Sequence, residues 1–340
     1  MRKIVWIGHF RGFSGFTTST REYFKSILPY FNNLYLAPLE VLKKNDPLRS
    51  YLVDLPLNET ELKVVNHQPT TDPTAECFFS VYEYNRIPDK WVKIFNTAKL
   101  IMTQSTFCKK EFASQIEDPE KIHVIPYIVP EYFTPQGPTY RIVDKDVFAF
   151  GSVFEWVTRK VPERTIRAFT EEFDKNESVS LILRSSHPFG KDLEPIINNI
   201  SQDPRIILVK KKIEDIAAFY RGLDAYISCT AGEGWGQTLT EAMVCGIPTI
   251  ASNHSGNLDF MNKNNSYLVD VHDWSPIQKG SLFKWKLPKI ESIKEVMRQV
   301  YENREMSKNK IKVENALKLK NELNRESIGP KIAELLKKIV

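Results

Sequence analysis

The sequence predicts an α/β protein made of two domains, each built around a parallel β-sheet. The chain has 340 residues, about twice the length of a usual single domain. Short apolar runs alternate with amphipathic segments of helical length, which is the pattern of parallel strands connected by helices. This alternation stops at 130–146, where three prolines and a glycine stand among turn-forming residues. We therefore expect this segment to link two similar halves.

In the first half, apolar runs of strand length predict strands at 3–8, 34–37, 63–66, 77–81, 100–103 and 122–125. Two helices are predicted between them, at 17–29, ending near Pro29, and at 105–115.

In the second half, the same kind of run predicts strands at 147–151, 180–183, 206–209, 225–228 and 248–251. Pro162 suits a first helical turn, and Ile166, Phe169 and Phe173 follow at helical spacing, so 162–173 is predicted to be a helix. An apolar stripe at helical spacing between 293 and 301 predicts another helix, with the stripe facing the core.

We expect a Rossmann-like domain at 1–142, a second one at 143–325, and a C-terminal helix at 326–340 that crosses back to the first. Ligands of open parallel sheets bind beside the carboxyl ends of the strands. The two domains are therefore expected to face each other across a ligand-binding cleft.

The charge balance excludes some classes of partner. There are 47 basic and 42 acidic residues, and the net charge of +5 is too small for a dedicated nucleic-acid binder. It suits an anionic substrate or an anionic membrane surface. Four scattered cysteines form no C-x-x-C pair, which indicates buried thiols in a reducing compartment. The sequence shows neither a signal peptide nor an apolar run of 18 residues, so we expect a cytoplasmic protein.

The first predicted strand leads into a glycine-containing loop, GHFRGFSGFTTST, in which Gly15 precedes Thr17, Thr18 and Ser19. We expect these hydroxyl residues to cap the following helix. Glycines let backbone amides approach a ligand closely, and a helix N-terminus favours anions. The spacing matches neither G-x-G-x-x-G nor a P-loop, so a ligand loop and an ordinary turn both remain open.

The most informative segment is CTAGEGWGQTLTEAMVCGIPTIASNHSGNLDF, at 229–260. A strand ends near Cys229, three glycines follow, and a helix is predicted to begin near Thr238. Glu233 and Glu241, eight positions apart, would both point into the cleft. Thr238 to Glu241 is also a capping-box pattern, in which Glu241 only caps its own helix. Both interpretations remain open.

The segment EGWGQTLTEAMVCGIPTIA resembles the signature of retaining glycosyltransferases of family 4, which have the GT-B fold, with Trp235 in the aromatic position. FAFGSVFEWVTRKVPERTIRAF, at 148–169, is similar to the family's strand, donor-phosphate loop and helix. The segment 82–112 resembles a subgroup tied to surface polysaccharide synthesis, as does NSYLVD followed by Trp285 and a helix at 291–303.

The resemblance implies a donor domain at 143–325 and an acceptor-side domain at 1–142. Lys160 and Arg159 would neutralise the donor diphosphate, Glu241 would hold the ribose hydroxyls, and Glu233 would contact the donor sugar. Glu233 and Lys160 are the implied catalytic residues. The implied donor-binding residues are Gly15, Arg159, Lys160, Gly234, Trp235, Gly236, Gln237, Thr238 and Glu241.

Three further features of the sequence give weaker indications of function. Tyr82 and Glu83 follow the strand predicted at 77–81 and are implied on the acceptor side, with a structural role as the alternative. The lysines at 210–212 lie where the family often seats the base, but a solvated charge run explains at least two of them. Many relatives have an arginine where this chain has Ser152, which leaves the phosphate site one cation short unless Arg184 or another basic residue substitutes.

The implied reaction transfers a hexose or pentose from a nucleoside-diphosphate sugar to a hydroxyl of a glycan or lipid-linked sugar. Front-face attack would retain the anomeric configuration, and fixed cations would replace a metal, so no cofactor is expected. The alternative is a non-catalytic nucleotide-sugar-binding subunit, which Ser152 alone supports. A nicotinamide dehydrogenase is disfavoured because the glycine fingerprint is absent.

An acidic triplet and a group of basic residues are also candidate functional features of the surface. The Asp144-Lys145-Asp146 triplet has the form of a metal-binding D-x-D motif, but a solvated turn in the linker is the favoured interpretation. Basic residues on the predicted N-terminal helices suggest peripheral contact with an anionic membrane. These residues are Arg21, Lys25, Lys109 and Lys110.

Overall fold

The computed structural model describes residues 2–12, 14–54, 57, 60–185, 203–211, 213–305 and 307–340. The chain forms two compact units. Unit 1 comprises Met1–Pro130 and Asn321–Val340, and unit 2 comprises Glu131–Lys320. Each unit contains one six-stranded parallel sheet. The sequence predicts a parallel sheet in each half, with six strands in the first but only five in the second, where the strand Tyr267–Val269 is missed.

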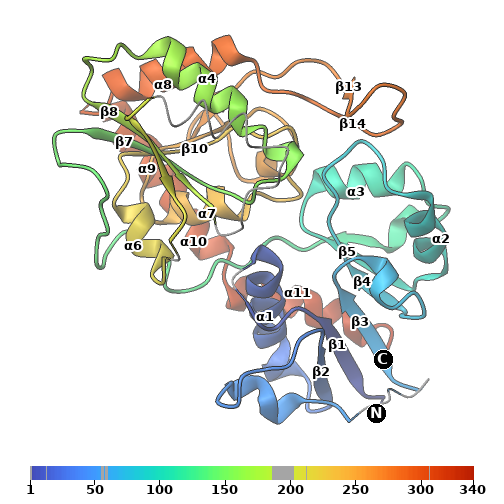
Figure 1. The fold of residues 1–340 in the computed structure, drawn as a ribbon. Coiled ribbons are helices and arrows are strands. Elements are labelled where there is room, and N and C mark those ends of the chain that lie inside the picture. Colours follow the sequence, from blue (N-terminus) through green and yellow to red (C-terminus); the bar gives the residue numbers. More distant parts are fainter. Residues whose placement is uncertain are drawn as a thin grey trace. The chain divides into compact units, whose positions relative to one another are not determined.

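Unit 1 has the strand order β2-β1-β3-β4-β5-β6. The strands are β1 (Ile4–Gly8), β2 (Leu34–Pro38), β3 (Leu62–Asn66), β4 (Cys77–Phe79), β5 (Leu100–Thr103) and β6 (Ile122–Val124). The helices are α1 (Gly15–Ile27), α2 (Asp89–Thr97), α3 (Thr106–Ala113) and α11 (Arg325–Lys337). Helices α1 and α11 pack together, and α2 and α3 join an apolar core with the other face of the sheet (Figure 1).

Unit 2 has the strand order β12-β11-β10-β7-β8-β9, with all six strands parallel. The strands are β7 (Phe148–Val153), β8 (Val179–Arg184), β9 (Ile206–Val209), β10 (Ala225–Ser228), β11 (Thr249–Ser252) and β12 (Tyr267–Val269). A short hairpin, β13 (Ser275–Pro276) with β14 (Lys284–Trp285), follows β12.

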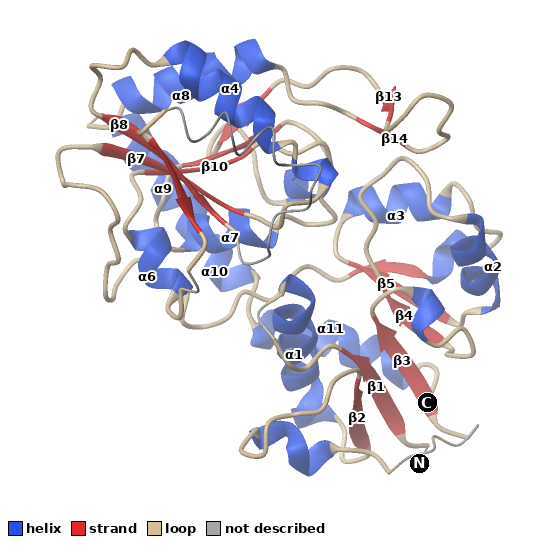
Figure 2. Ribbon diagram, viewed as in Figure 1, coloured by secondary structure: helices blue, strands red, loops and turns tan. Residues whose placement is uncertain are grey.

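The helices of unit 2 are α4 (Pro162–Glu172), α6 (Ile216–Arg221), α7 (Gln237–Val244), α8 (Ile290–Glu302) and α9 (Ser307–Leu317), and α10 (Leu319–Glu322) crosses its boundary. Helices α4 and α8 pack together on one face of the sheet, while α7 packs with α6 and α9 (Figure 1). Figure 2 shows the strands of this sheet flanked by helices, which leaves its strands buried on both faces, as parallel sheets require.

The start of α1 differs from the prediction. Ser14 is the N-cap, and its hydroxyl accepts a hydrogen bond of 3.2 Å from the amide of Thr17. The helix therefore begins at Gly15, and the predicted caps at 17–19 lie inside its first turns. The helix ends at Ile27, and Pro29 falls in a 3-10 turn at Leu28–Tyr30.

The units divide after Pro130, whereas the sequence predicts the boundary after residue 142. The linker segment packs with unit 2 because the Tyr140 amide donates to the Ala218 carbonyl and Arg141 pairs with Asp224 at 2.8 Å. At the other end of the chain, Asn321–Val340 belongs to unit 1. There Arg325 forms an ion pair with Glu22 of α1 at 2.7 Å.

The structure also shows the state of the cysteines and of the Asp144-Lys145-Asp146 triplet. All four cysteines are free and buried, as predicted. The Asp144-Lys145-Asp146 triplet lies in an exposed turn, as favoured above. Within the residues that the structure describes, no helix has both the length and the apolar character to cross a membrane.

Gly329 is required by the close packing of α11 on α1. A Cβ atom at this position would lie 2.3 Å from the Ser26 carbonyl oxygen. Pro330 also disfavours a helical backbone at the residue before it when that residue carries a side chain.

Replacing an interior helical glycine by alanine normally adds about 1 kcal/mol of stability. Here we predict that Gly329→Ala lowers the free energy of unfolding by about 1–3 kcal/mol, because the helices must separate. Chemical denaturation of both proteins measures this difference. Lys331→Ala, at an exposed position of the same helix, is the control and should unfold like the wild type.

Candidate functional site

The candidate site lies where the strand order of unit 2 reverses. Strand β7 begins the sheet, yet its neighbours are β8 and β10, so the loops after β7 and β10 leave the same edge side by side. Ligands of open parallel sheets bind at such switch points. The loop after β7 carries Arg159 and Lys160, and the loop after β10 carries Glu233. A backbone hydrogen bond of 2.8 Å, from Ala231 to the Arg159 carbonyl, joins the two loops.

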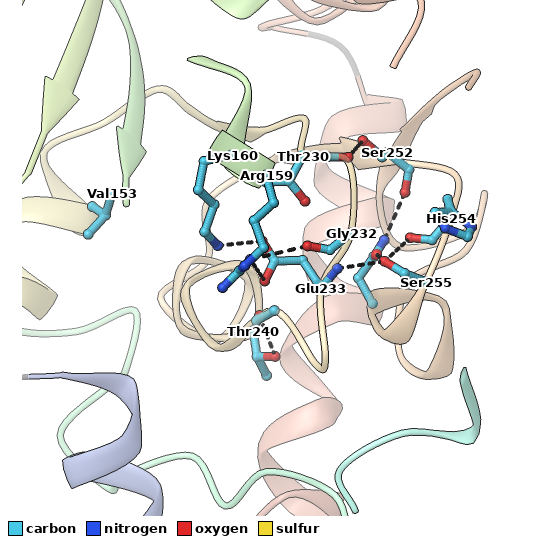
Figure 3. A network of polar contacts seen from close by, with 12 residues as sticks. Val153, Arg159, Lys160, Thr230, Gly232, Glu233, Thr240, Ser252, His254 and Ser255 are labelled. Carbon is cyan, nitrogen blue, oxygen red and sulfur yellow. Dashed lines mark hydrogen bonds and ion pairs between the residues drawn. The ribbon is translucent and has the colours of Figure 1, made fainter. Parts of the chain in front are cut away.

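Glu233 is a buried carboxylate held between two cations (Figure 3). Lys160 Nζ lies 2.5 Å from Glu233 Oε1, and an Arg159 guanidinium nitrogen lies 3.3 Å from Oε2. Arg159 also donates to the Gly232 carbonyl at 3.1 Å. All three charged side chains are largely withdrawn from water, so their attraction is weakly screened.

The two cations decide the ionisation state of Glu233. Burial alone would raise the pKa of this carboxyl, but Lys160 and then Arg159 outweigh burial and hold the pKa below its ordinary value of 4.5. Glu233 is therefore ionised near neutral pH. One carboxylate and two cations leave the cluster with one net positive charge, which favours an anion.

Strained backbone surrounds this cluster. The Glu233 amide donates to Ser255 Oγ at 2.9 Å, and the Gly256 amide donates to the Glu233 carbonyl at 3.0 Å. Ser255 has a φ of 74°, and Val161, directly after Lys160, has a φ of 38°. In the described ranges these are the two non-glycine residues with positive φ. Such strain costs of order 1–3 kcal/mol per residue and concentrates at functional sites.

Helix α7 begins beside Glu233 with unsatisfied amides. Its N-cap is Gly236, whose φ of 99° suits glycine, and no side chain caps the first turn. The amides of this turn can therefore donate to an anionic ligand. A Cβ atom at Gly236 would also lie 2.9 Å from a Leu239 methyl carbon.

The capping-box interpretation of Glu241 is wrong. Because Gly236 is the N-cap, Glu241 is the fifth residue of α7 and lies beyond the first turn. Its carboxylate instead accepts a hydrogen bond of 2.9 Å from the Tyr220 hydroxyl. Burial, and then the charge of Glu241, raises the pKa of Tyr220 well above its ordinary value, so this hydroxyl stays a donor. Glu241 is thus a buried acceptor on the face of the sheet that α6 and α7 share.

The remaining residues of the loop divide by what their side chains contact. Trp235 donates to Thr240 Oγ1 at 2.9 Å and stacks on Phe260 at 4.7 Å, so its indole belongs to the interior. Gln237 is partly exposed, and its buried Oε1 has no hydrogen-bond partner. Thr238 hydrogen-bonds to Tyr226. The backbone at Gly234 is buried.

Three predicted site residues lie in unit 1. Gly15 is the exposed first residue of α1. Tyr82 packs on Tyr84 and Trp91, and burial raises its pKa to about 12. These contacts support the structural alternative, and an acceptor-side role for Tyr82 stays a prediction. Glu83 follows it in a partly exposed loop.

The structure also shows where the other predicted cations lie. Lys210 and Lys211 are exposed after β9, and the third lysine, Lys212, lies outside the described residues. Arg21 pairs with Asp46 at 2.8 Å, and Lys25 lies 3.6 Å from Glu22. Lys109 and Lys110 are exposed on α3.

Sequence reasoning missed Tyr220 and Ser255, which hold Glu241 and Glu233 in place. Tyr220 lies in an ordinary apolar helix, and Ser255 lies in a loop without a recognisable motif. No local pattern identifies either residue. The parts of the chain with described coordinates contain no group of three or more His, Cys, Asp or Glu placed to hold a metal ion.

Comparison with known sequences connects this site to a family. Residues 143–316 match the family model of glycosyl transferases group 1. The "Capsular polysaccharide biosynthesis glycosyltransferase CapM" of Staphylococcus aureus is 26% identical over 140 residues, which is 41% of this chain and 37% of CapM. "Protein CapJ" of the same organism is 42% identical over 70 residues, or 20% of this chain and 17% of CapJ. The matches thus span well under two thirds of these relatives.

Solved structures share the fold over the whole chain. HepE (Alr3699) of Anabaena, in complex with UDP and glucose, has a TM-score of 0.72 at 15% identity. The match covers 100% of this chain and 100% of HepE. WaaG, "a glycosyltransferase involved in lipopolysaccharide biosynthesis", has a TM-score of 0.73 at 12% identity, over 98% of this chain and 99% of WaaG. The predicted GT-B fold is confirmed.

The buried ion pair predicts an unusual response to pH in Glu233→Gln. At pH 7 the substitution leaves Lys160 buried without its closest counter-charge, and we expect a loss of about 3–5 kcal/mol in unfolding free energy. A carboxyl whose folded pKa lies below its unfolded pKa stabilises the fold above that range, and this stabilisation disappears as pH falls through the folded value. The gap between wild type and variant should therefore shrink below about pH 4.5. Denaturant titrations from pH 7 to pH 3 measure it.

Glu171→Gln is the matched control, because Glu171 forms an exposed ion pair with Arg167 on α4. Because this pair is exposed, its loss should produce a much smaller gap from the wild type at every pH than Glu233→Gln does. A pH-independent gap for Glu233→Gln would show that Glu233 is not held ionised by Lys160 and Arg159.

Proposed function

The chain belongs to the glycosyl transferases group 1 family, and on that premise we propose that it transfers a sugar from a nucleoside-diphosphate sugar to a hydroxyl group of a glycan or lipid-linked sugar. The observation that carries this proposal is the cationic cluster of Arg159 and Lys160 beside the uncapped start of α7. Departure of a nucleoside diphosphate develops negative charge, and prearranged cations and amides stabilise it.

The relatives support the choice of donor and of acceptor class. HepE was solved with UDP and glucose, and CapM is named for capsular polysaccharide biosynthesis. We therefore favour a hexose or pentose carried by UDP as donor and a surface glycan or its lipid-linked precursor as acceptor. In this proposal unit 2 binds the donor, and unit 1, with Glu83 as a candidate contact, binds the acceptor.

Each charged residue has a proposed role. Lys160 and Arg159 bind the diphosphate, the amides of Gly236 to Thr238 assist them, and Glu241 accepts hydrogen bonds from the ribose hydroxyls. Glu233 contacts the transferred sugar and keeps the two cations in place between catalytic cycles. Since these residues supply positive charge at the leaving group, we propose that the reaction needs no divalent metal.

We propose that the reaction retains the anomeric configuration, which the same arrangement supports. A leaving phosphate held by Lys160 and the amides of α7 remains beside the anomeric carbon and can accept the proton of the incoming hydroxyl on that face. Attack from the face of departure retains the anomeric configuration. The anomeric coupling constant in the proton NMR spectrum of the product tests retention.

Donor hydrolysis tests the proposed function directly. Thermal-shift screening with UDP, GDP and ADP sugars first identifies the donor, since a ligand at 100 times its dissociation constant adds about 2.7 kcal/mol of stability. We predict slow release of nucleoside diphosphate by the wild type, unchanged in EDTA, and at least about a hundredfold loss in Lys160→Ala. Lys160→Arg, which keeps the charge opposite Glu233, should fold normally and retain part of the activity.

Lys145→Ala removes an exposed lysine from the same unit and should leave hydrolysis unchanged. Donor binding without turnover in any protein would favour a non-catalytic nucleotide-sugar-binding subunit. Activity that is lost in EDTA and restored by Mg²⁺ would contradict metal independence.

A further inference from the structure

We propose that Arg184 is an additional binding residue for the phosphates of the nucleotide donor. The proposal rests on the proposed function and adds a residue to its donor site. Arg184 is the last residue of β8, and it pairs in register with Val153 of β7. The Phe154 amide donates to the Arg184 carbonyl at 3.1 Å. Arg184 therefore lies at the sheet edge where the loop carrying Arg159 and Lys160 begins.

The guanidinium of Arg184 has no counter-charge in the described part of the molecule. The side chain is half-buried, its Nε is fully buried, and this atom has no hydrogen-bond partner. No ion pair with a described carboxylate is formed. Burial lowers the pKa of Arg184, as expected for a cation that has lost water without gaining a partner. The buried part of this cation has lost water without gaining a partner, which costs free energy, so a function that needs the charge is the simplest reason for its presence.

Two neutral polar atoms at the same edge are also unsatisfied. Ser185 Oγ, next in the chain, and Gln237 Oε1, at the start of α7, are buried without hydrogen-bond partners. Buried polar atoms normally have partners, and those that lack them require a reason. The donors of Arg184 and Ser185 suit phosphate oxygens, while the Gln237 oxygen, which can only accept, suits a hydroxyl or N–H group of the same ligand.

The direction of Arg184 places it on the nucleotide side of the site. Successive side chains of a strand face opposite sides, and Leu183 belongs to the core cluster that packs against α4 and α8. Arg184 therefore faces α6 and α7. Tyr220 of α6 is the ionisable group whose charge affects the pKa of Arg184. Tyr220 donates to Glu241, the proposed ribose ligand.

The charge of the site supports a phosphate as the partner. Glu233 already offsets one of the two cations, so Arg159 and Lys160 contribute one net positive charge. Each phosphate of the donor is a diester with about one negative charge, and the terminal phosphate of the departed nucleoside diphosphate carries about −1.5 to −2 at pH 7. Arg184 adds a third cation at the phosphate end of the site, away from the Glu241 carboxylate that is proposed to bind the ribose, and its planar guanidinium suits two phosphate oxygens at once.

Calorimetry with a nucleoside diphosphate and its parent nucleoside tests the assignment. The probe is whichever of UDP, GDP or ADP stabilises the wild type most, with uridine, guanosine or adenosine as its partner. Arg184→Met keeps the buried alkyl stem and removes the charge. It should weaken nucleoside diphosphate binding about ten- to hundredfold and change nucleoside binding less than twofold. Arg184→Lys should lie between wild type and Arg184→Met.

Glu241→Gln is the matched comparison, because a ribose ligand contacts both probes and its loss should weaken both. Free of nucleotide, Arg184→Met should melt no lower than the wild type, since it removes an unpaired charge. Unchanged nucleoside diphosphate affinity in Arg184→Met, equal weakening of both probes, or a lower melting temperature would each overturn the assignment. If no nucleoside diphosphate binds the wild type, the proposed function fails, and the role of Arg184 fails with it.

Discussion

The buried carboxylate of Glu233 is the constraint on which the rest of unit 2 depends. An ionised carboxylate is stable in an interior only if opposite charges and hydrogen-bond donors replace the water it has lost. Lys160 and Arg159 supply the charges, and the loop after β10 is fixed by Ser255 and Gly256. Removing any of these partners would leave an uncompensated group in a dry environment, so the loops on both sides have little freedom to move.

The topology of the sheet brings these partners together. Glu233 is 73 residues from Lys160 in sequence, and the two meet because β7 and β10 are neighbours in the sheet. The positive φ values of Val161 and Ser255 are a further cost of holding both loops in this arrangement. The same loops deliver the uncapped start of α7, so fold stability and anion binding use one set of contacts.

The sequence predicts the regular part of this structure well, because strands buried on both faces and amphipathic helices have strong periodic signals. It does not predict β12. It also misses the Ser14 cap, because a glycine is an uncommon first helical residue. The motif around Glu233 and Glu241 identifies the site, but not its internal contacts. The Tyr220 hydrogen bond to Glu241 and the unpaired guanidinium of Arg184 depend on tertiary packing, which no local pattern encodes.

Glu233 and Lys160 should stabilise each other energetically, as well as lying close together. A double-mutant cycle on unfolding free energy, with Lys160→Met, Glu233→Gln and the double variant, measures that coupling most directly. We predict a coupling of about 2–3 kcal/mol, with the double variant at least as stable as Glu233→Gln alone, because it no longer buries an uncompensated lysine. Losses that add to within about 0.5 kcal/mol would contradict this account of the site.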